Sequence, residues 1–304
     1  MNNKPIIGIV GAGAMGSLFA FFLHNRFTIL LYDSNPDIVN EIKMHGLLVE
    51  INSAQQTFYP TISNDPEILT PADIIFLFIK SFATEVAIST IQPYIKPDAI
   101  VVTLQNGIGN VELISSMIDN PLVYGTTTIG ATKLSPSSVR FGGTGFIIIG
   151  GDSYRDCSTV HSLLQKANLT VTIDPDPKKA IWEKAIINAA INPLGALLEV
   201  PNGKLMKNNN TVNIMICIIQ EACLVAQAYG IFIDSDHMIE TTMTVCRNTQ
   251  NNFCSMLQDI LAKRKTEIDS INGSIINIAK QYSIDTPYNT TIYKLIKYKE
   301  SQYI

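Results

Sequence analysis

The sequence has few cysteines, few histidines and little charge, and each shortage argues against a class of protein. Its five cysteines are odd in number and form no C-x-x-C pair, which argues against a disulfide scaffold or a zinc site and fits a reducing cytosol. The four histidines are scattered and form no H-E-x-x-H or comparable pattern, so no metal site is expected. Charged residues make up 16% of the 304, with 22 basic against 26 acidic side chains and no long basic run, so no nucleic-acid partner is expected.

Apolar residues make up 46% of the chain, enough for a sizeable core and for two domains of ordinary size. The uncharged stretch from Pro5 to Leu23 resembles a signal peptide or a membrane span in its hydropathy. Glycines interrupt this stretch, and residues 28–33 after it form a strand pattern that needs a partner. We therefore expect a cytoplasmic protein with no membrane partner. The sequence is compatible with a homodimer but does not fix the oligomeric state.

A glycine-rich turn stands between a short apolar strand at residues 6–10 and an apolar helical run that extends to about residue 25. In this setting the G-x-G-x-x-G pattern is typical of dinucleotide binding, because its glycines permit a tight turn, close approach of a pyrophosphate, and close packing of helix and strand. The alternative is a glycine-rich turn in an ordinary βαβ unit. The expected cofactor-binding residues are Gly11, Ala12, Gly13, Ala14, Met15 and Gly16.

Asp33 ends the second expected strand, about 20 residues after the glycines. A carboxylate at this place usually accepts hydrogen bonds from the adenosine ribose, and it repels a 2′-phosphate. Asp33 therefore favours NAD over NADP. The alternative is a simple turn aspartate in the sequence Asp-Ser-Asn-Pro.

Two further apolar runs, at residues 74–79 and 99–104, are typical of central parallel strands. Lys80 follows the first and Asn106 follows the second, at the strand ends where open parallel sheets bind ligands. The alternatives are a solvated loop lysine and a plain Asn-Gly turn. Further on, the strand patterns at 138–141 and 146–149 suggest an antiparallel pair.

The pattern changes near the Asp-Pro-Asp-Pro stretch that ends at Pro177. Helical periodicity fills nearly all of the chain after it. We therefore expect an α/β protein whose N-terminal, Rossmann-type, doubly wound domain covers residues 1–175 and whose all-α domain covers residues 176–304.

The first helix of that second domain carries a polar stripe on an otherwise apolar surface. Lys184, Asn188 and Asn192 follow at intervals of four residues, before an end or kink expected at Pro193. Lysine is seldom buried without a partner, so the stripe suggests a polar cavity or a ligand. The alternative is a lysine that reaches solvent beside two core amides.

Three more polar positions follow in the helical part. Asn202 lies in a Pro-Asn-Gly turn, Ser255 can open a helix whose end could hold a carboxylate, and Glu267 shares a helical stripe with isoleucines. Taken alone, Ser255 and Glu267 read as a helix cap and a first-turn carboxylate.

Together these motifs resemble the ketopantoate reductase (2-dehydropantoate 2-reductase) family over nearly the whole chain. The resemblance rests on the glycine motif, Lys80, the Asn-Gly pair, and five longer stretches. These stretches are Gly125–Thr128, Trp182–Pro193, Pro201–Gly203, Ser255–Ile260 and Thr266–Gly273. The last two are the specific ones. The resemblance implies a Rossmann domain, a helical domain, and an active site in the cleft between them.

The resemblance also implies a reaction: hydride transfer from NAD(P)H reduces 2-dehydropantoate to (R)-pantoate, a step of pantothenate and coenzyme A biosynthesis. It makes Lys184 the general acid and places the small keto acid against a set of polar residues. Those are Asn188, Asn192, Asn202, Ser255, Glu267 and Asn106. It places the cofactor against Lys80, Asn106 and Ala131 in addition to the glycine turn.

One position departs from the family pattern. Members that use NADPH commonly carry an arginine where this chain has Asp33, and no basic residue follows before Lys43. The family therefore suggests NADP, whereas Asp33 suggests NAD, and we expect NADH to serve at least as well. Two other functions stay open: a dehydrogenase for another 2-oxo or β-hydroxy acid, and a non-catalytic nucleotide sensor.

Overall fold

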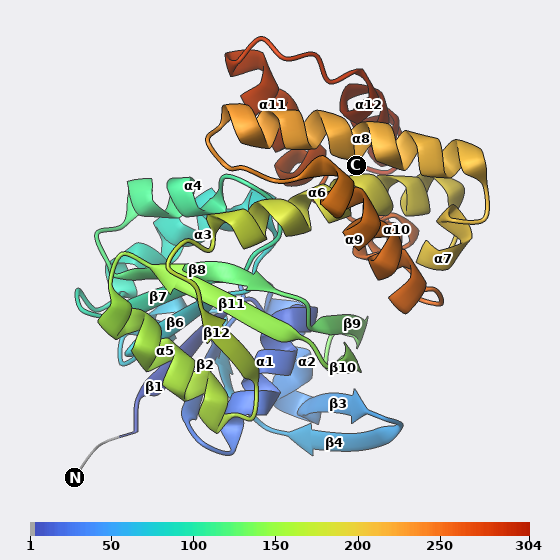
Figure 1. Cartoon of the computed structure of the whole chain (residues 1–304). Coiled ribbons are helices and arrows are strands. Elements are labelled where there is room, and N and C mark those ends of the chain that lie inside the picture. Colours follow the sequence, from blue (N-terminus) through green and yellow to red (C-terminus); the bar gives the residue numbers. More distant parts are fainter. Residues whose placement is uncertain (1–3) are drawn as a thin grey trace. The chain divides into compact units, whose positions relative to one another are not determined.

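The computed structural model describes residues 4–304, and the chain divides into two compact units (Figure 1). The first unit runs to Gln105 and resumes from Asn110 to Pro177. The second unit holds Lys178–Ile304 together with the short segment Asn106–Gly109. The transfer of this short segment to the second unit was not expected from the sequence.

The first unit is built on an eight-stranded sheet in the order β12-β11-β8-β7-β6-β1-β2-β5. All of its neighbouring pairs are parallel except β8 with β11. Its apolar central strands are buried, as strands covered on both faces must be. The strands are β1 (Ile6–Val10), β2 (Thr28–Tyr32), β5 (Thr61–Ser63), β6 (Ile74–Leu77), β7 (Ile100–Thr103), β8 (Leu122–Thr127), β11 (Phe146–Gly151) and β12 (Thr170–Ile173).

The strand order reverses direction between β1 and β6, which pair in parallel. Ligands of doubly wound sheets bind outside the strand ends at such a switch point. The glycine turn after β1 and Lys80 after β6 both lie there. The accompanying helices are α1 (Ala14–His24), α2 (Pro36–His45), α3 (Thr84–Ile91), α4 (Asn110–Met117) and α5 (Tyr154–Lys166), with 3-10 turns at Pro66–Leu69, Ser81–Ala83 and Gln92–Tyr94.

A second, four-stranded sheet in the order β4-β3-β10-β9 packs against α1. Its strands are β3 (Leu47–Ile51), β4 (Ala54–Phe58), β9 (Gly130–Ser135) and β10 (Ser138–Gly143). The antiparallel pairing expected between 138–141 and 146–149 is therefore wrong: β10 pairs with β9 and β3, whereas β11 pairs with β8 and β12. The glycine-rich stretch 142–145 between β10 and β11 lets the chain pass from one sheet to the other.

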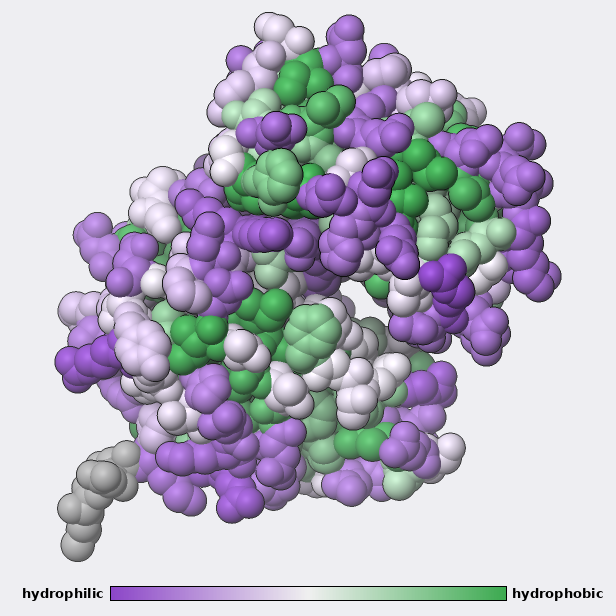
Figure 2. Space-filling model, in the orientation of Figure 1, coloured by the Kyte–Doolittle hydropathy of each residue, from purple (hydrophilic) through white to green (hydrophobic). Residues whose placement is uncertain are grey.

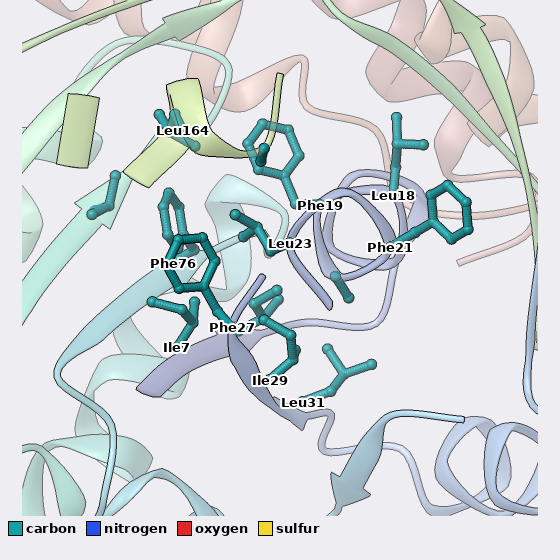
Figure 3. Packing of buried hydrophobic residues seen from close by; sticks show 14 of the residues in the cluster. Ile7, Leu18, Phe19, Phe21, Leu23, Phe27, Ile29, Leu31, Phe76 and Leu164 are labelled. Atoms are coloured by element: carbon teal, nitrogen blue, oxygen red, sulfur yellow. The ribbon is translucent and has the colours of Figure 1, made fainter. Parts of the chain in front are cut away.

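The larger of the two hydrophobic clusters of the first unit surrounds α1. Phe19 of α1 is fully buried, with its ring centroid 6.2 Å from that of Phe76 on β6 (Figure 3). Leu18 and Phe21 project from the same helix (Figure 3). The ring centroid of Phe21 lies 5.8 Å from that of Phe58 on the second sheet. This packing fixes α1, and with it the glycine turn, against both sheets.

All the regular elements of the second unit are helical. They are α6 (Lys178–Leu198), α7 (Asn202–Leu205), α8 (Asn209–Ala228), α9 (Ser235–Asn248), α10 (Ser255–Leu261), the π-helical turn η4 (Asp269–Gly273), α11 (Ser274–Gln281) and α12 (Pro287–Glu300). Helix α8 is long and apolar enough to cross a membrane, but its buried residues belong to the core of this unit. On the face drawn in Figure 2, hydrophilic side chains lie over much of the surface of each unit.

The sequence predicted an end or a kink at Pro193. Helix α6 continues through this proline to Leu198, so the helix end is wrong. Proline lacks the N–H that would bond to the carbonyl four residues earlier. Here the buried Asn272 of η4 donates its amide to that carbonyl, on Ala189, over 3.2 Å. A side chain from another element thus replaces the missing backbone donor.

Candidate active site

The glycine turn of the first unit has the geometry that a dinucleotide needs. Gly11 has a φ of +100°, and a Cβ at Gly16 would lie 1.9 Å from the Gly11 carbonyl oxygen, so neither position accepts a side chain. A Cβ at Gly13 would meet just the Phe78 carbonyl, at 4.0 Å, so the backbone there is open to a ligand. Gly13 also caps α1, whose first N–H groups and positive dipole end suit a pyrophosphate. These residues fit the pyrophosphate of a dinucleotide.

Asp33 lies directly after β2 and binds the glycine turn itself. One carboxylate oxygen accepts the Ala12 N–H over 2.7 Å, and the other accepts the Asn35 N–H over 2.9 Å. Asp33 therefore shapes its own turn and also binds the glycine turn, while its contact with a ribose stays a prediction. Each oxygen keeps a second lone pair for a ribose hydroxyl.

The other two expected cofactor residues lie in the same unit. Lys80 precedes the 3-10 turn Ser81–Ala83 and is partly buried, which differs from a fully solvated loop lysine. Ala131 lies on β9 opposite Phe141 and packs against the core. Strand β9 was not predicted, since its residues are neither apolar nor strictly alternating.

In the second unit, α6 carries the polar stripe. Lys184 and Asn188 are partly buried and Asn192 is buried. Burial lowers the pKa of Lys184 to about 8, and the negative charge of Glu267 acts in the opposite direction. An amine with such a pKa can both hold and release a proton near neutral pH.

Glu267 is 7% exposed, and it accepts a hydrogen bond from the Asn106 amide over 3.2 Å. The segment that carries Asn106 is bound to η4 and α11, since the Ile108 N–H donates to the Ser270 carbonyl and the Ser274 hydroxyl donates to the Ile108 carbonyl. Three residues distant in the chain (Asn106, Lys184 and Glu267) are thus linked by hydrogen bonding and charge.

A polar network behind Glu267 was missed in the sequence. The buried carboxylate of Glu300 accepts the N–H and the hydroxyl of Thr266, both over 2.7 Å, and pairs with Lys297 over 2.7 Å. Lys297 also contacts Asp269 of η4 over 3.3 Å. This network holds the backbone next to Glu267. Helix α12, which supplies it, shows only ordinary surface charges in its sequence.

Asn202 is joined to the segment before α10, because its N–H donates to the Asn252 carbonyl over 3.0 Å. Asn202 donates its amide to the Thr249 hydroxyl over 2.9 Å, while its buried side-chain oxygen has no hydrogen-bond partner among the residues described. Ser255 is exposed and is the first residue of α10, but the cap is Cys254, whose sulfur accepts the Leu257 N–H. The Cys254 thiol also donates to the Asn192 carbonyl over 3.3 Å.

Two family descriptions match the chain consecutively. "Ketopantoate reductase PanE/ApbA" matches residues 7–153, and "Ketopantoate reductase PanE/ApbA C terminal" matches residues 176–300. The chain belongs to the ketopantoate reductase family. The two matched ranges contain the glycine turn and the Lys184 stripe respectively.

Curated relatives in this family match over nearly their whole length. The 2-dehydropantoate 2-reductase of Pyrococcus horikoshii is 34% identical, over 97% of this chain and 97% of its own. That of Vibrio cholerae is 29% identical, over 98% of each chain.

Solved structures agree with the fold. D-mandelate dehydrogenase with NADH and anilino(oxo)acetate superposes with a TM-score of 0.93 at 30% identity, over 97% of this chain and 98% of that chain. A PanE/ApbA family ketopantoate reductase from Ralstonia eutropha gives 0.91 at 25% identity, with the same coverage. The family and these neighbours indicate a nicotinamide cofactor. Among residues 4–304, no cluster of three or more potential metal ligands occurs.

Proposed function

We propose that this chain reduces 2-dehydropantoate to (R)-pantoate, with residues 1–175 as the nucleotide domain and residues 176–304 as the substrate domain. Full-length similarity to 2-dehydropantoate 2-reductases supports the substrate. The observation that carries the mechanism is Lys184, whose pKa of about 8 is set by burial and opposed by Glu267. The free cysteines of the described chain fit a cytoplasmic location.

The cofactor, when bound, supplies a hydride for the keto carbon. Negative charge then develops on the keto oxygen, and a proton donor within hydrogen-bond reach lowers the barrier. Lys184 takes that role: its ammonium donates to the developing alkoxide and becomes a neutral amine. A pKa near 8 makes this transfer easier than it would be from an ordinary lysine with a pKa of 10.5.

The polar residues around Lys184 hold the keto acid. Glu267 accepts the substrate hydroxyl, while Asn106 fixes the orientation of the Glu267 carboxylate. The unpartnered buried oxygen of Asn202 offers a further acceptor. Asn188, Asn192 and Ser255 supply the remaining polar contacts.

NADH serves at least as well as NADPH in this proposal. The Asp33 carboxylate repels a 2′-phosphate, and its second lone pairs accept the ribose hydroxyls. D-mandelate dehydrogenase, 30% identical to this chain, binds NADH. The family pattern with an arginine at the end of the second strand is absent here.

The test is a spectrophotometric assay that follows loss of nicotinamide absorbance with 2-dehydropantoate, with each cofactor in turn. The proposal predicts turnover with both cofactors and kcat/KM for NADH equal to or above that for NADPH. Absence of turnover at saturating cofactor and substrate refutes the substrate assignment. A strong NADPH preference refutes the role given to Asp33.

A second function is reduction of a different 2-keto acid, and the similarity to D-mandelate dehydrogenase favours it. A panel that adds the keto acid of mandelate and aliphatic branched keto acids distinguishes the two. Highest kcat/KM for 2-dehydropantoate supports the first function, and highest kcat/KM for an aromatic keto acid supports the second. Cofactor binding without turnover of any keto acid would favour the sensor hypothesis.

A further inference from the structure

A second lysine with a displaced pKa lies at the glycine turn. Lys133 projects from β9, and its amine donates to the Ala12 carbonyl over 2.7 Å and to the Ser17 hydroxyl oxygen over 3.0 Å. Ala12 belongs to the turn and Ser17 to α1, so the lysine joins the second sheet to the nucleotide motif. The G-x-G-x-x-G pattern contains no residue from this sheet.

Both backbone polar groups of Ala12 are hydrogen-bonded to side chains. Its N–H is bound by Asp33, and its carbonyl accepts from Lys133 and, over 3.0 Å, from the buried Ser17 hydroxyl. Ser17 lies at the first turn of α1, directly beyond Gly16. Three side chains, from α1, from β9 and from the residue after β2, therefore fix the backbone of the residue between the first and second glycines of the turn.

The position of the Lys133 charge requires a physical reason. Burial lowers the pKa of this lysine to about 8, and the charge of Asp33 partly offsets the effect. Both oxygens that its amine contacts are neutral, so they satisfy hydrogen bonds without neutralising the cation. A buried cation of this kind is costly unless it meets negative charge, and a dinucleotide brings two negative phosphates to this turn.

We propose that Lys133 is a positioning residue for the nucleotide: it holds the Ala12 backbone in its binding conformation and places positive charge behind the pyrophosphate turn. The inference rests on the nicotinamide cofactor of the proposed function, not on its keto acid. Lys133 raises affinity for NADH and NADPH alike, because both carry the same pyrophosphate. A preformed turn loses less freedom on binding, which strengthens affinity without new contacts.

The experiment compares Lys133→Met, Lys133→Arg and the control Arg140→Met by titrating nicotinamide fluorescence with each purified protein. Arg140 is exposed on β10 opposite Thr132 and pairs with the partly buried Glu50, so its loss removes a charge from the same sheet but not from the turn. Lys133→Met should raise Kd for both cofactors about tenfold, the value of one hydrogen bond to a charged group. Lys133→Arg should recover most of the affinity, and Arg140→Met should leave Kd unchanged.

A merely structural role for Lys133 gives a different result. It would lower the melting temperature of the cofactor-free protein yet leave Kd of the folded protein within twofold of wild type, and that outcome overturns the proposal. A rise in cofactor Kd in Arg140→Met as large as that in Lys133→Met also overturns the proposal. If Lys133→Met does not fold, Lys133→Gln replaces it, because the glutamine amide keeps hydrogen-bond donors but carries no charge. The Kd of Lys133→Gln for each cofactor should lie above that of Lys133→Arg. Wild-type protein that binds cofactor but does not reduce 2-dehydropantoate contradicts the proposed function alone.

Discussion

The Asn106 side chain donates a hydrogen bond to the Glu267 carboxylate over 3.2 Å, across 161 positions of sequence. The contact joins a residue that follows strand β7 to the segment that precedes η4. It orients the carboxylate whose charge opposes the fall in the pKa of Lys184. A change at either residue is therefore expected to reach the proton donor.

The pH dependence of keto-acid reduction should report Lys184. Its pKa is about 8, so the amine is protonated and competent as an acid below that pH and neutral above it. We expect kcat/KM to be level on the acid side of pH 8 and to fall about tenfold for each further pH unit above it. The measurement is kcat/KM from pH 6 to 10 at saturating NADH. A level profile up to pH 10 would contradict the assignment.

Replacing Glu267 by Gln should move that profile. The carboxylate raises the pKa of Lys184, so its removal lets burial lower the pKa further, and the fall in kcat/KM should begin at a lower pH than in wild type. KM for the keto acid should rise about tenfold through the lost contact with the substrate hydroxyl. Glu199→Gln is the control, because Glu199 is exposed and pairs with Lys299; it should change neither quantity. If kcat/KM of Glu267→Gln begins to fall at the same pH as in wild type, the charge of Glu267 does not act on Lys184.

Asp33→Asn should change the cofactor preference. Asparagine keeps an oxygen for the Ala12 N–H and removes the charge that repels a 2′-phosphate. The ratio of kcat/KM for NADPH to that for NADH should rise about tenfold, through one removed charge repulsion in a partly solvated site. The ratio is measured with both cofactors on both proteins. If it does not rise, Asp33 acts on the turn alone.

Asn272→Ala should destabilise the second unit. The Asn272 amide bonds to the Ala189 carbonyl left open by Pro193 and to Asn289, and the residue is fully buried. Loss of these bonds should cost about 1–3 kcal/mol of unfolding free energy. Urea denaturation measures the change, with the exposed Asn277→Ala of α11 as the control. Equal stability of both variants would show that the Ala189 carbonyl needs no such partner.

The sequence predicted the elements that local pattern specifies. The apolar runs gave the central strands, the glycines gave the nucleotide turn, and the four-residue spacing gave the Lys184 stripe. Each of these signals needs no knowledge of distant partners. The division into an N-terminal α/β part and a C-terminal helical part followed from the same periodicities.

What sequence analysis missed depends on distant pairing. Strand β9 has weak local signal and exists because β10 pairs with it, so Lys133 could not be placed at the turn. Asn106 belongs to the second unit through bonds to residues more than 150 positions away. Pro193 remains within a helix because Asn272 supplies a donor from another element. Patterns within a short stretch of sequence do not identify these distant partners.

The central claim is that Lys184 delivers the proton, and Lys184→Ala tests it most directly. The substitution removes a buried charge, so the fold and melting temperature should be kept or improved, and cofactor Kd should be unchanged. The kcat for 2-dehydropantoate at saturating NADH should fall about 10²–10⁴-fold. A folded variant with kcat within threefold of wild type, or one that fails to fold, would contradict the account.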